Sequence, residues 1–217
     1  MKKLLTLSLL SVLAFANQTK DDDYLVQITP KINYVTAKDS GQKIKIERVQ
    51  DVENLLTDDY AKTSRSCPPF CIQPTKIDKN IQNIGELELL DFVSKKVALN
   101  KGILVDTRLS SWFELETIPS SINIPFSSLK DANSNKVSKV FQVLGMKVKS
   151  NNEWDFSNAK ELIIFDNGMW CSQANRFVKT LLQHKYPTKK ILYYRAGLQG
   201  WKILGLTTSV HKEIKVN

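Results

Sequence analysis

The sequence predicts an α/β fold, a mainly parallel sheet flanked by helices on both faces, with a small β-hairpin in an N-terminal extension. Three short apolar runs rich in β-branched and aromatic residues predict buried strands at 103–105, 162–165 and 191–194. Apolar residues at helical spacing predict helices at 85–98, 137–144 and 174–182. Strands that alternate with helices in this way favour parallel pairing, with the helices covering the sheet.

Residues 1–16 have the three parts of a secretory signal peptide: a basic start at Lys2-Lys3, a short apolar run and an Ala14-Phe15-Ala16 cleavage site. The apolar run is too short to span a bilayer comfortably. We expect cleavage after Ala16, and a periplasmic or secreted protein with no stable membrane insertion afterwards. A retained membrane anchor is the alternative.

The composition is basic, with 31 Lys and Arg against 22 Asp and Glu and a formal net charge of +9. Loss of Lys2 and Lys3 with the signal peptide lowers that charge to +7, because no acidic residue leaves with them. The remaining lysines are scattered, and export separates the chain from nucleic acid, so we expect no nucleic-acid partner. We expect a solvated basic surface that weakly attracts anionic substrates or membrane surfaces.

The remaining length fits an extension at 17–83, one main domain at 84–209 and a tail at 210–217. The extension starts with a polar lead-in at 17–23. Between 24 and 50, apolar and polar residues alternate on both sides of an Asp39-Ser40-Gly41 turn signal, which predicts the hairpin. A short helical turn is expected at 52–56.

The three cysteines are Cys67, Cys71 and Cys171. Cys67 and Cys71 lie in a stretch at 64–74 with three prolines, which predicts a stiff, non-helical loop. An odd number of cysteines in an oxidising compartment suggests one bridge, Cys67 with Cys71, and one reactive thiol on Cys171. The close pair is also compatible with a redox-active role near Cys171. Half of a metal site is less favoured, because His184 and His211 lie far along the chain, and we expect no metal.

The main domain begins with a predicted helix at 85–98, whose apolar face is formed by Leu87, Leu90, Val93 and Val97. The strand at 103–105 then ends at Asp106, two residues before Arg108. Open α/β sheets gather their ligands at the carboxyl ends of strands, so Asp106 and Arg108 are candidate supporting residues of a site. A structural ion pair that holds the loop is the other interpretation.

The segments that follow also alternate between predicted strands and helices. A short strand at 122–124 ends at Pro125, the helix at 137–144 ends at Gly145, and 147–158 is a polar connecting insertion in which Trp154 is expected to pack. After the strand at 191–194, Ala196-Gly197 predicts a tight turn into a short helix whose Trp201 belongs to the core.

Cys171 lies where the strand at 162–165 gives way to the helix at 174–182. Unpaired amides and the positive end of the helix dipole at such a position predict a lowered cysteine pKa. We expect the loop from Cys171 to Arg176 to point the amides of Ser172, Gln173, Ala174 and Asn175 inward, with the Arg176 guanidinium at the rim, as a site for a small anion or a sulfur atom. An inert buried cysteine is the alternative.

This Cys-x4-Arg loop resembles the active-site loop of rhodanese sulfurtransferases. Two further segments resemble motifs of that family in the same order: 103–108 with 118–125, and 194–201 ending at Gly205-Leu206. The resemblance covers roughly residues 84 to 209. It implies a rhodanese-like fold and sulfur transfer through a persulfide on Cys171, with no metal or organic cofactor. Small sulfur-containing anions would be the partners, together with a possible protein thiol as donor or acceptor.

The sequence also departs from the family pattern. Ser172 stands where an Arg is frequent, Ala174 where a Gly is common, and Thr117, Ser120 and Ser121 replace the usual His, Gly and Ala. These changes remove a positive charge, so thiosulfate is expected to be a modest donor beside persulfides or polysulfides. Phosphatases that share the fold have a longer loop and a His before the Cys. A non-enzymatic persulfide carrier or binding module, and a thiol–disulfide redox protein, are the alternative functions.

Overall fold

The computed structural model describes residues 24–129, 135–149 and 153–211. The predicted signal peptide at 1–16, the lead-in at 17–23 and most of the predicted tail lie outside these ranges. None of the helices within them is long and apolar enough to cross a membrane.

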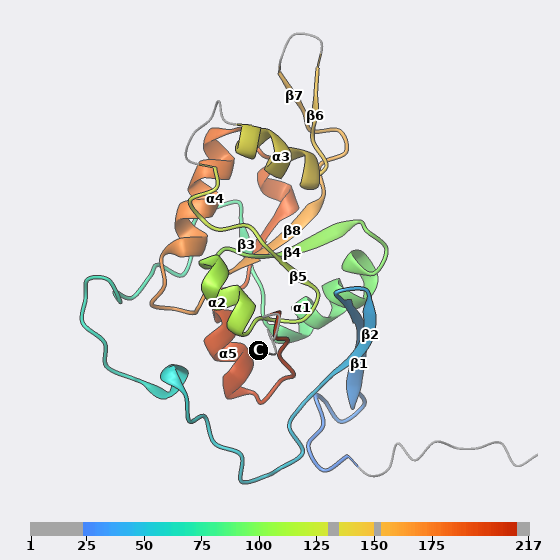
Figure 1. The fold of residues 1–217 in the computed structure, drawn as a ribbon, viewed down its shortest axis with the longest axis vertical. Coiled ribbons are helices and arrows are strands. Elements are labelled where there is room, and N and C mark those ends of the chain that lie inside the picture. The colour runs from blue at the N-terminus through green and yellow to red at the C-terminus, as the bar shows by residue number, and fades with distance from the viewer. Residues whose placement is uncertain (1–23, 130–134, 150–152, 212–217) are drawn as a thin grey trace, which may run out of the picture.

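The core of the molecule is a five-stranded parallel sheet, as the sequence predicts (Figure 1). Its strand order is β3-β9-β8-β4-β5, with parallel pairing throughout. The strands are β3 (Gln82–Asn83), β4 (Gly102–Asp106), β5 (Ser121–Asn123), β8 (Glu161–Phe165) and β9 (Ile191–Tyr193).

Helices cover both faces of this sheet. The α3 (Asn135–Val143) and α4 (Gln173–Gln183) helices pack on one face, and α1 (Glu86–Phe92) and α5 (Gly197–Ile203) on the other. Alternation along the strands divides the core accordingly, since Ile103 and Val105 contribute to the first cluster and Leu104 to the second. The apolar face predicted for α4 is buried, with Leu182 at its margin.

The first helix has most of its predicted face buried. After α1 the chain continues as one π-helical segment, η2 (Val93–Val97), so the predicted extent is close. Leu90 and Val93 are buried and Val97 packs against the same cluster, as predicted. Leu87 is half exposed, whereas Leu89 and Phe92 are buried. Several apolar side chains crowd this helix, and only the position of the sheet selects among them.

The predicted hairpin is present as β1 (Tyr34–Asp39) paired antiparallel with β2 (Gln42–Glu47). Ala37 and Ile46 are buried in the same cluster as α1 and α5. The expected helical turn at 52–56 is wrong; a 3-10 turn, η1 (Asp59–Ala61), forms slightly later, where Asp58 caps it by accepting from the Tyr60 amide.

Several further elements were not predicted, among them the short edge strand β3 of the central sheet. Segments too short to show a period form α2 (Ser110–Leu115) and η3 (Thr188–Lys190), and the polar insertion folds as a small hairpin of β6 (Lys147–Val148) and β7 (Trp154–Asp155). Trp154 packs edge-on against Phe141 with ring centroids 4.8 Å apart, as expected for a packing residue.

The connections between strands distinguish the carboxyl ends of β4 and β8 from the other strand ends. The chain leaves β4 towards β5 on one side and leaves β8 towards β9 on the other, so their carboxyl ends form a topological switch point. Asp106, at the end of β4, pairs with Phe165, at the end of β8. A ligand site of this fold is therefore expected just beyond Asp106 and Phe165.

Trp201 is fully buried on α5, and its indole Nε1 donates to the Thr207 carbonyl at 2.8 Å. Trp201→Ala is expected to lower the free energy of unfolding by about 3–5 kcal/mol, because it leaves a cavity and an unpaired carbonyl. The measurement is urea unfolding. Ile203→Ala on the same helix, where the side chain is 63% exposed, is the matched control, with an expected change within about 0.5 kcal/mol.

Candidate active site

The turn from β8 into α4 begins at Asp166 and ends at Ser172. The α4 helix starts at Gln173, and the Arg176 amide donates to the Ser172 carbonyl at 3.0 Å. Residues 173–176 are therefore the first turn of a helix. The predicted loop from Cys171 to Arg176 is wrong in its extent, because the turn runs from Asp166 to Ser172 and the residues after it are helical. The Ala174 amide does point inward, but its partner is Asp166.

The amides of this turn surround a carboxylate. Asp166 is fully buried, and it accepts from the Gly168 amide at 3.1 Å and from the Ala174 amide at 2.8 Å. The anion-binding end of α4 is thus occupied by a side chain of the protein itself. Burial raises the pKa of Asp166 to about 7, although both amides oppose the shift.

Cys171 lies at the far end of the same turn. Its amide donates to the Gly168 carbonyl at 2.9 Å, and the Asn167 side-chain amide lies 3.6 Å from its Sγ. The residue is only 6% exposed. Burial, followed by the charge of Asp166, raises the pKa of Cys171 to about 12, so the predicted lowering is wrong. The helix terminus cannot stabilise a thiolate fully when a carboxylate already holds one of its amides.

Arg176, which was predicted to lie at the rim of the loop, makes a different contact. The Arg176 side chain is exposed, and its guanidinium lies over the Phe126 ring, 4.3 Å from the centroid. Asn175 is buried and donates from Nδ2 to the Gln73 side chain at 3.0 Å. The sequence places these residues near Cys171 correctly, but helical geometry turns Arg176 away.

Asp106 and Arg108 form a buried ion pair, with Arg108 Nη2 2.6 Å from Asp106 Oδ2. The Arg108 guanidinium also donates to the Tyr60 hydroxyl and to the Glu116 carbonyl, and Thr117 donates to Asp106. Of the two interpretations of Asp106 and Arg108, these contacts favour the structural ion pair.

A cavity of about 240 Å³ opens beside this ion pair. Arg108, Asn167 and Trp170 line it, together with Tyr60 and Trp112. Cys171 does not line the cavity, but Asn167 links the two, since it contacts the Cys171 sulfur and accepts from the Tyr60 hydroxyl at 2.7 Å. Asn167 therefore lies between the thiol and this cavity.

Within the described residues, no group of three or more His, Cys, Asp or Glu side chains is arranged to hold a metal ion.

Comparison with known proteins agrees with this architecture. The family described as the Rhodanese-like domain matches residues 88–204, just over half of the chain. The chain belongs to the rhodanese-like family. No curated protein matches it.

Several solved structures resemble this rhodanese-like protein in fold. The rhodanese-like domain of the Anabaena sp. Alr3790 protein is 12% identical, with a TM-score of 0.39, over 64% of this chain and 85% of that one. A rhodanese-related protein of Thermoplasma volcanium is 17% identical, with a TM-score of 0.39, over 59% and 98%. A possible tyrosine phosphatase of Rhodopseudomonas palustris is 16% identical, with a TM-score of 0.44, over 61% and 88%.

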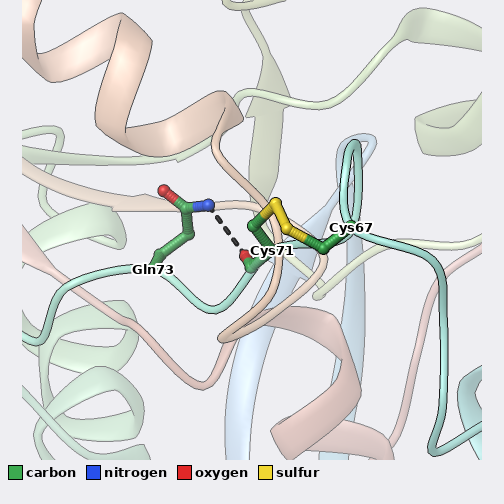
Figure 2. Close-up of a disulfide and its surroundings, with 3 residues drawn as sticks. All are labelled: Cys67, Cys71 and Gln73. Atoms are coloured by element: carbon green, nitrogen blue, oxygen red, sulfur yellow. Dashed lines mark hydrogen bonds between the residues drawn. A yellow bond between two sulfur atoms is a disulfide. The ribbon is translucent and has the colours of Figure 1, made fainter.

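A segment of the extension lies over the site of this rhodanese-like protein. We call residues 58–75 the strap. It contains the disulfide between Cys67 and Cys71, which leaves Cys171 as a thiol (Figure 2). Gln73 donates from its side chain to the Cys71 carbonyl at 2.8 Å, which closes the disulfide turn (Figure 2).

The strap contacts the turn on both sides of Cys171. The Phe70 ring packs edge-on against Trp170 with centroids 5.2 Å apart, and the Gln73 amide donates to the Met169 carbonyl at 2.8 Å. Beyond Cys171, Asn175 Nδ2 donates to the Gln73 side chain at 3.0 Å. Arg195, which follows β9, anchors the strap by donating to the Gln73 carbonyl at 2.7 Å. The strap therefore packs against the turn that carries Cys171.

The sequence analysis missed two parts of this site. Asp166 follows a buried strand in the same way as Asp106, and that signal could have identified it. The strap could not have been placed, because an irregular, proline-rich loop has no period that indicates which surface it covers.

Asp166 makes stability depend on pH. Its pKa is about 7 in the folded protein and near the ordinary value of 3.8 in an unfolded chain, so the native state binds more protons between these values. The free energy of unfolding is then expected to fall as the pH rises from about 4 to 7, by about 4 kcal/mol at most from this group. Asp166→Asn should flatten the slope of unfolding free energy against pH; an unchanged slope would contradict the assignment.

Weakening the strap should expose the thiol. Phe70→Ala removes the ring contact with Trp170, worth about 1 kcal/mol, and is expected to raise the rate of Cys171 alkylation several-fold. Peptide mass spectrometry without reductant measures that rate while the disulfide stays intact. Ile72→Ala in the same strap, where the side chain is 86% exposed, is the control and should leave the rate unchanged.

Proposed function

We propose that this rhodanese-like protein is a sulfurtransferase that moves a sulfane sulfur through a persulfide on Cys171. The donor is a persulfide, a polysulfide or thiosulfate, and the acceptor is a thiol or cyanide. The protein acts in the periplasm or outside the cell; the Cys67–Cys71 pairing supports this oxidising location.

One observation carries the proposal. Cys171 is the cysteine without a disulfide partner, and it lies at the switch point of the sheet, in the turn between β8 and α4 of a rhodanese-like domain. Asn167 Nδ2, at 3.6 Å, points a donor at its sulfur, a contact that stabilises negative charge there.

The chemistry needs two displacements. In the first, the Cys171 thiolate attacks the outer sulfur of the donor, the donor's S–S bond breaks, and a persulfide is left on Cys171. With thiosulfate the leaving group is sulfite. In the second, an acceptor thiolate or cyanide attacks the outer sulfur of this persulfide and releases the Cys171 thiolate. This is covalent catalysis with ping-pong kinetics.

The electrostatics favour one class of donor. Thiosulfate is a dianion, and the Asp166 carboxylate lies beside Cys171 while the Arg176 guanidinium lies over Phe126. An organic persulfide brings less negative charge to the same place. We therefore propose that a persulfide is the better donor and thiosulfate the poorer one.

The burial of Cys171 under the strap also supports a second candidate, a persulfide carrier without turnover towards small acceptors. A partner protein would then displace the strap before sulfur moves. The two candidates differ in whether small thiols or cyanide discharge the persulfide.

The test is to incubate the protein with an organic persulfide or with thiosulfate and to map added sulfur by mass spectrometry. We expect one extra sulfur on Cys171 and at least about tenfold faster loading from the persulfide, because of charge repulsion. Cys171→Ser should accept none, whereas Cys67→Ser should still load Cys171 if the disulfide is structural. Absence of sulfur on Cys171 with every donor would overturn the proposal.

Adding cyanide to the loaded protein separates the two candidates. Thiocyanate release with repeated turnover indicates a sulfurtransferase, and a persulfide that survives small acceptors indicates a carrier.

A further inference from the structure

Tyr60 of the strap is connected to the Cys171 sulfur by a continuous row of hydrogen bonds between side chains. Arg108 Nη1 donates to the Tyr60 hydroxyl at 3.0 Å, and that hydroxyl donates to Asn167 Oδ1 at 2.7 Å. Asn167 Nδ2 in turn donates to Cys171 Sγ at 3.6 Å. The row therefore joins the extension, the end of β4 and the turn that carries the thiol.

The chemistry of the donors sets the direction of this row. A guanidinium group has no acceptor, so the Tyr60 oxygen has to accept from Arg108. Among the described residues, Asn167 is the one acceptor that the Tyr60 hydroxyl contacts, and it receives the hydroxyl proton. Asn167 then presents its oxygen to Tyr60, which leaves its NH₂ group for the Cys171 sulfur. Without the hydroxyl, the Asn167 amide could face the sulfur with either end.

Tyr60 and Asn167 are held in register by one residue of α5. The Gln199 side chain donates to the Tyr60 carbonyl at 2.8 Å, and the Gln199 backbone amide donates to the Asn167 carbonyl at 2.9 Å. Gln199 also accepts from the Trp170 indole at 2.7 Å. Asp58 fixes the other side of Tyr60 by accepting from its backbone amide at 2.9 Å. The hydroxyl and the amide that it orients therefore keep one relative geometry.

The Tyr60 hydroxyl keeps its proton throughout the neutral pH range, because burial raises the pKa of Tyr60 to about 12. At the other end of the row, the Asn167 side chain lowers the pKa of Cys171, whereas burial and then the charge of Asp166 raise it. Tyr193 of β9 is a further titratable group that interacts with Cys171. Neither Asp166 nor Tyr193 is hydrogen-bonded to Tyr60 in the described part of the chain, so a change at Tyr60 reaches the sulfur through Asn167.

We propose that Tyr60 is a positioning residue, whose hydroxyl orients the Asn167 amide so that its NH₂ group stabilises negative charge on the Cys171 sulfur. This role rests on the proposed sulfurtransferase function for its place in a reaction. In the discharge step, an acceptor thiolate bonds to the outer sulfur of the Cys171 persulfide, the S–S bond breaks, and its electron pair returns to Cys171 Sγ. Asn167 Nδ2 contacts the atom that gains this charge.

The extension then becomes part of the site. The rhodanese-like match covers residues 88–204, which include Asn167 and Cys171 but not Tyr60. The domain therefore supplies the nucleophile and its hydrogen-bond donor, and the extension supplies the group that orients this donor.

The test is a double-mutant cycle on Cys171 alkylation by iodoacetamide, which involves no sulfur donor. At a fixed, mildly alkaline pH, Asn167→Ala is expected to slow alkylation about tenfold, and Tyr60→Phe, which keeps the ring, about threefold. A lower thiol pKa raises the thiolate fraction more than it lowers nucleophilicity, so loss of the donor slows the reaction. The double variant should react like Asn167→Ala alone, because Tyr60 acts through Asn167.

Tyr24→Phe is the matched control, since it removes a hydroxyl that is bonded to Glu47 elsewhere in the extension, and it should keep the wild-type rate. Two results would overturn the proposal. One is a Tyr60→Phe rate at or above that of the wild type. The other is a double variant about threefold slower than Asn167→Ala, which is what independent structural effects would give.

A spectroscopic measurement tests the orientation directly. In protein labelled with ¹⁵N-asparagine, the Asn167 side-chain signal is identified by its loss in Asn167→Ala. Tyr60→Phe and Cys171→Ser are each expected to move that signal, because each removes one of its two partners, whereas Tyr24→Phe should leave it in place. An Asn167 signal that Tyr60→Phe does not move would contradict the proposed role.

Sulfur transfer separates this role from the function on which it rests. With Cys171 loaded from an organic persulfide, Tyr60→Phe is expected to discharge sulfur to a small thiol about threefold more slowly than the wild type. If the wild type takes up no sulfur but the alkylation cycle shows the coupling, the sulfurtransferase function fails and the positioning of Asn167 by Tyr60 stands. If sulfur loads and discharges equally fast in both proteins, the function stands and the role of Tyr60 fails.

Discussion

A buried carboxyl group is the constraint around which this site is built. Asp166 follows a central strand and is fully buried, and the amides of Gly168 and Ala174 donate to its two oxygens. Those amides exist because the chain turns there from β8 into α4. The helix start, the turn and the position of Cys171 are therefore mutually dependent: removing the carboxylate would leave two amides facing inward without a partner.

The same constraint changes how the cysteine has to work. A rhodanese-like site that offered its helix terminus to the reacting sulfur would stabilise a thiolate directly. Here Asp166 holds the Ala174 amide, and its charge together with burial favours the protonated thiol. Such a thiol is also less exposed to chance oxidation, because the thiolate is the form that oxidants attack.

The extension packs against the same turn. Phe70 contacts Trp170 and Gln73 contacts Met169 and Asn175, and the disulfide between Cys67 and Cys71 constrains the strap beside these contacts. The disulfide limits the freedom of the strap whether it is docked or lifted, which lowers the entropic cost of docking. Because the extension supplies this cover, the rhodanese-like domain and the residues before it act as one functional unit.

The sequence by itself determined the parallel sheet, the hairpin, the helix faces of α4 and the location of Cys171 between β8 and α4, because periodic apolar patterns and turn residues are local signals. It also indicated which cysteine stays unpaired. Only the tertiary structure decided that Arg176 turns towards Phe126, that Asp166 occupies the helix terminus and that the strap packs against Trp170 beside Cys171. These features depend on contacts between segments distant in the chain, and on burial, which sets the pKa of a side chain and has no signature in residue order.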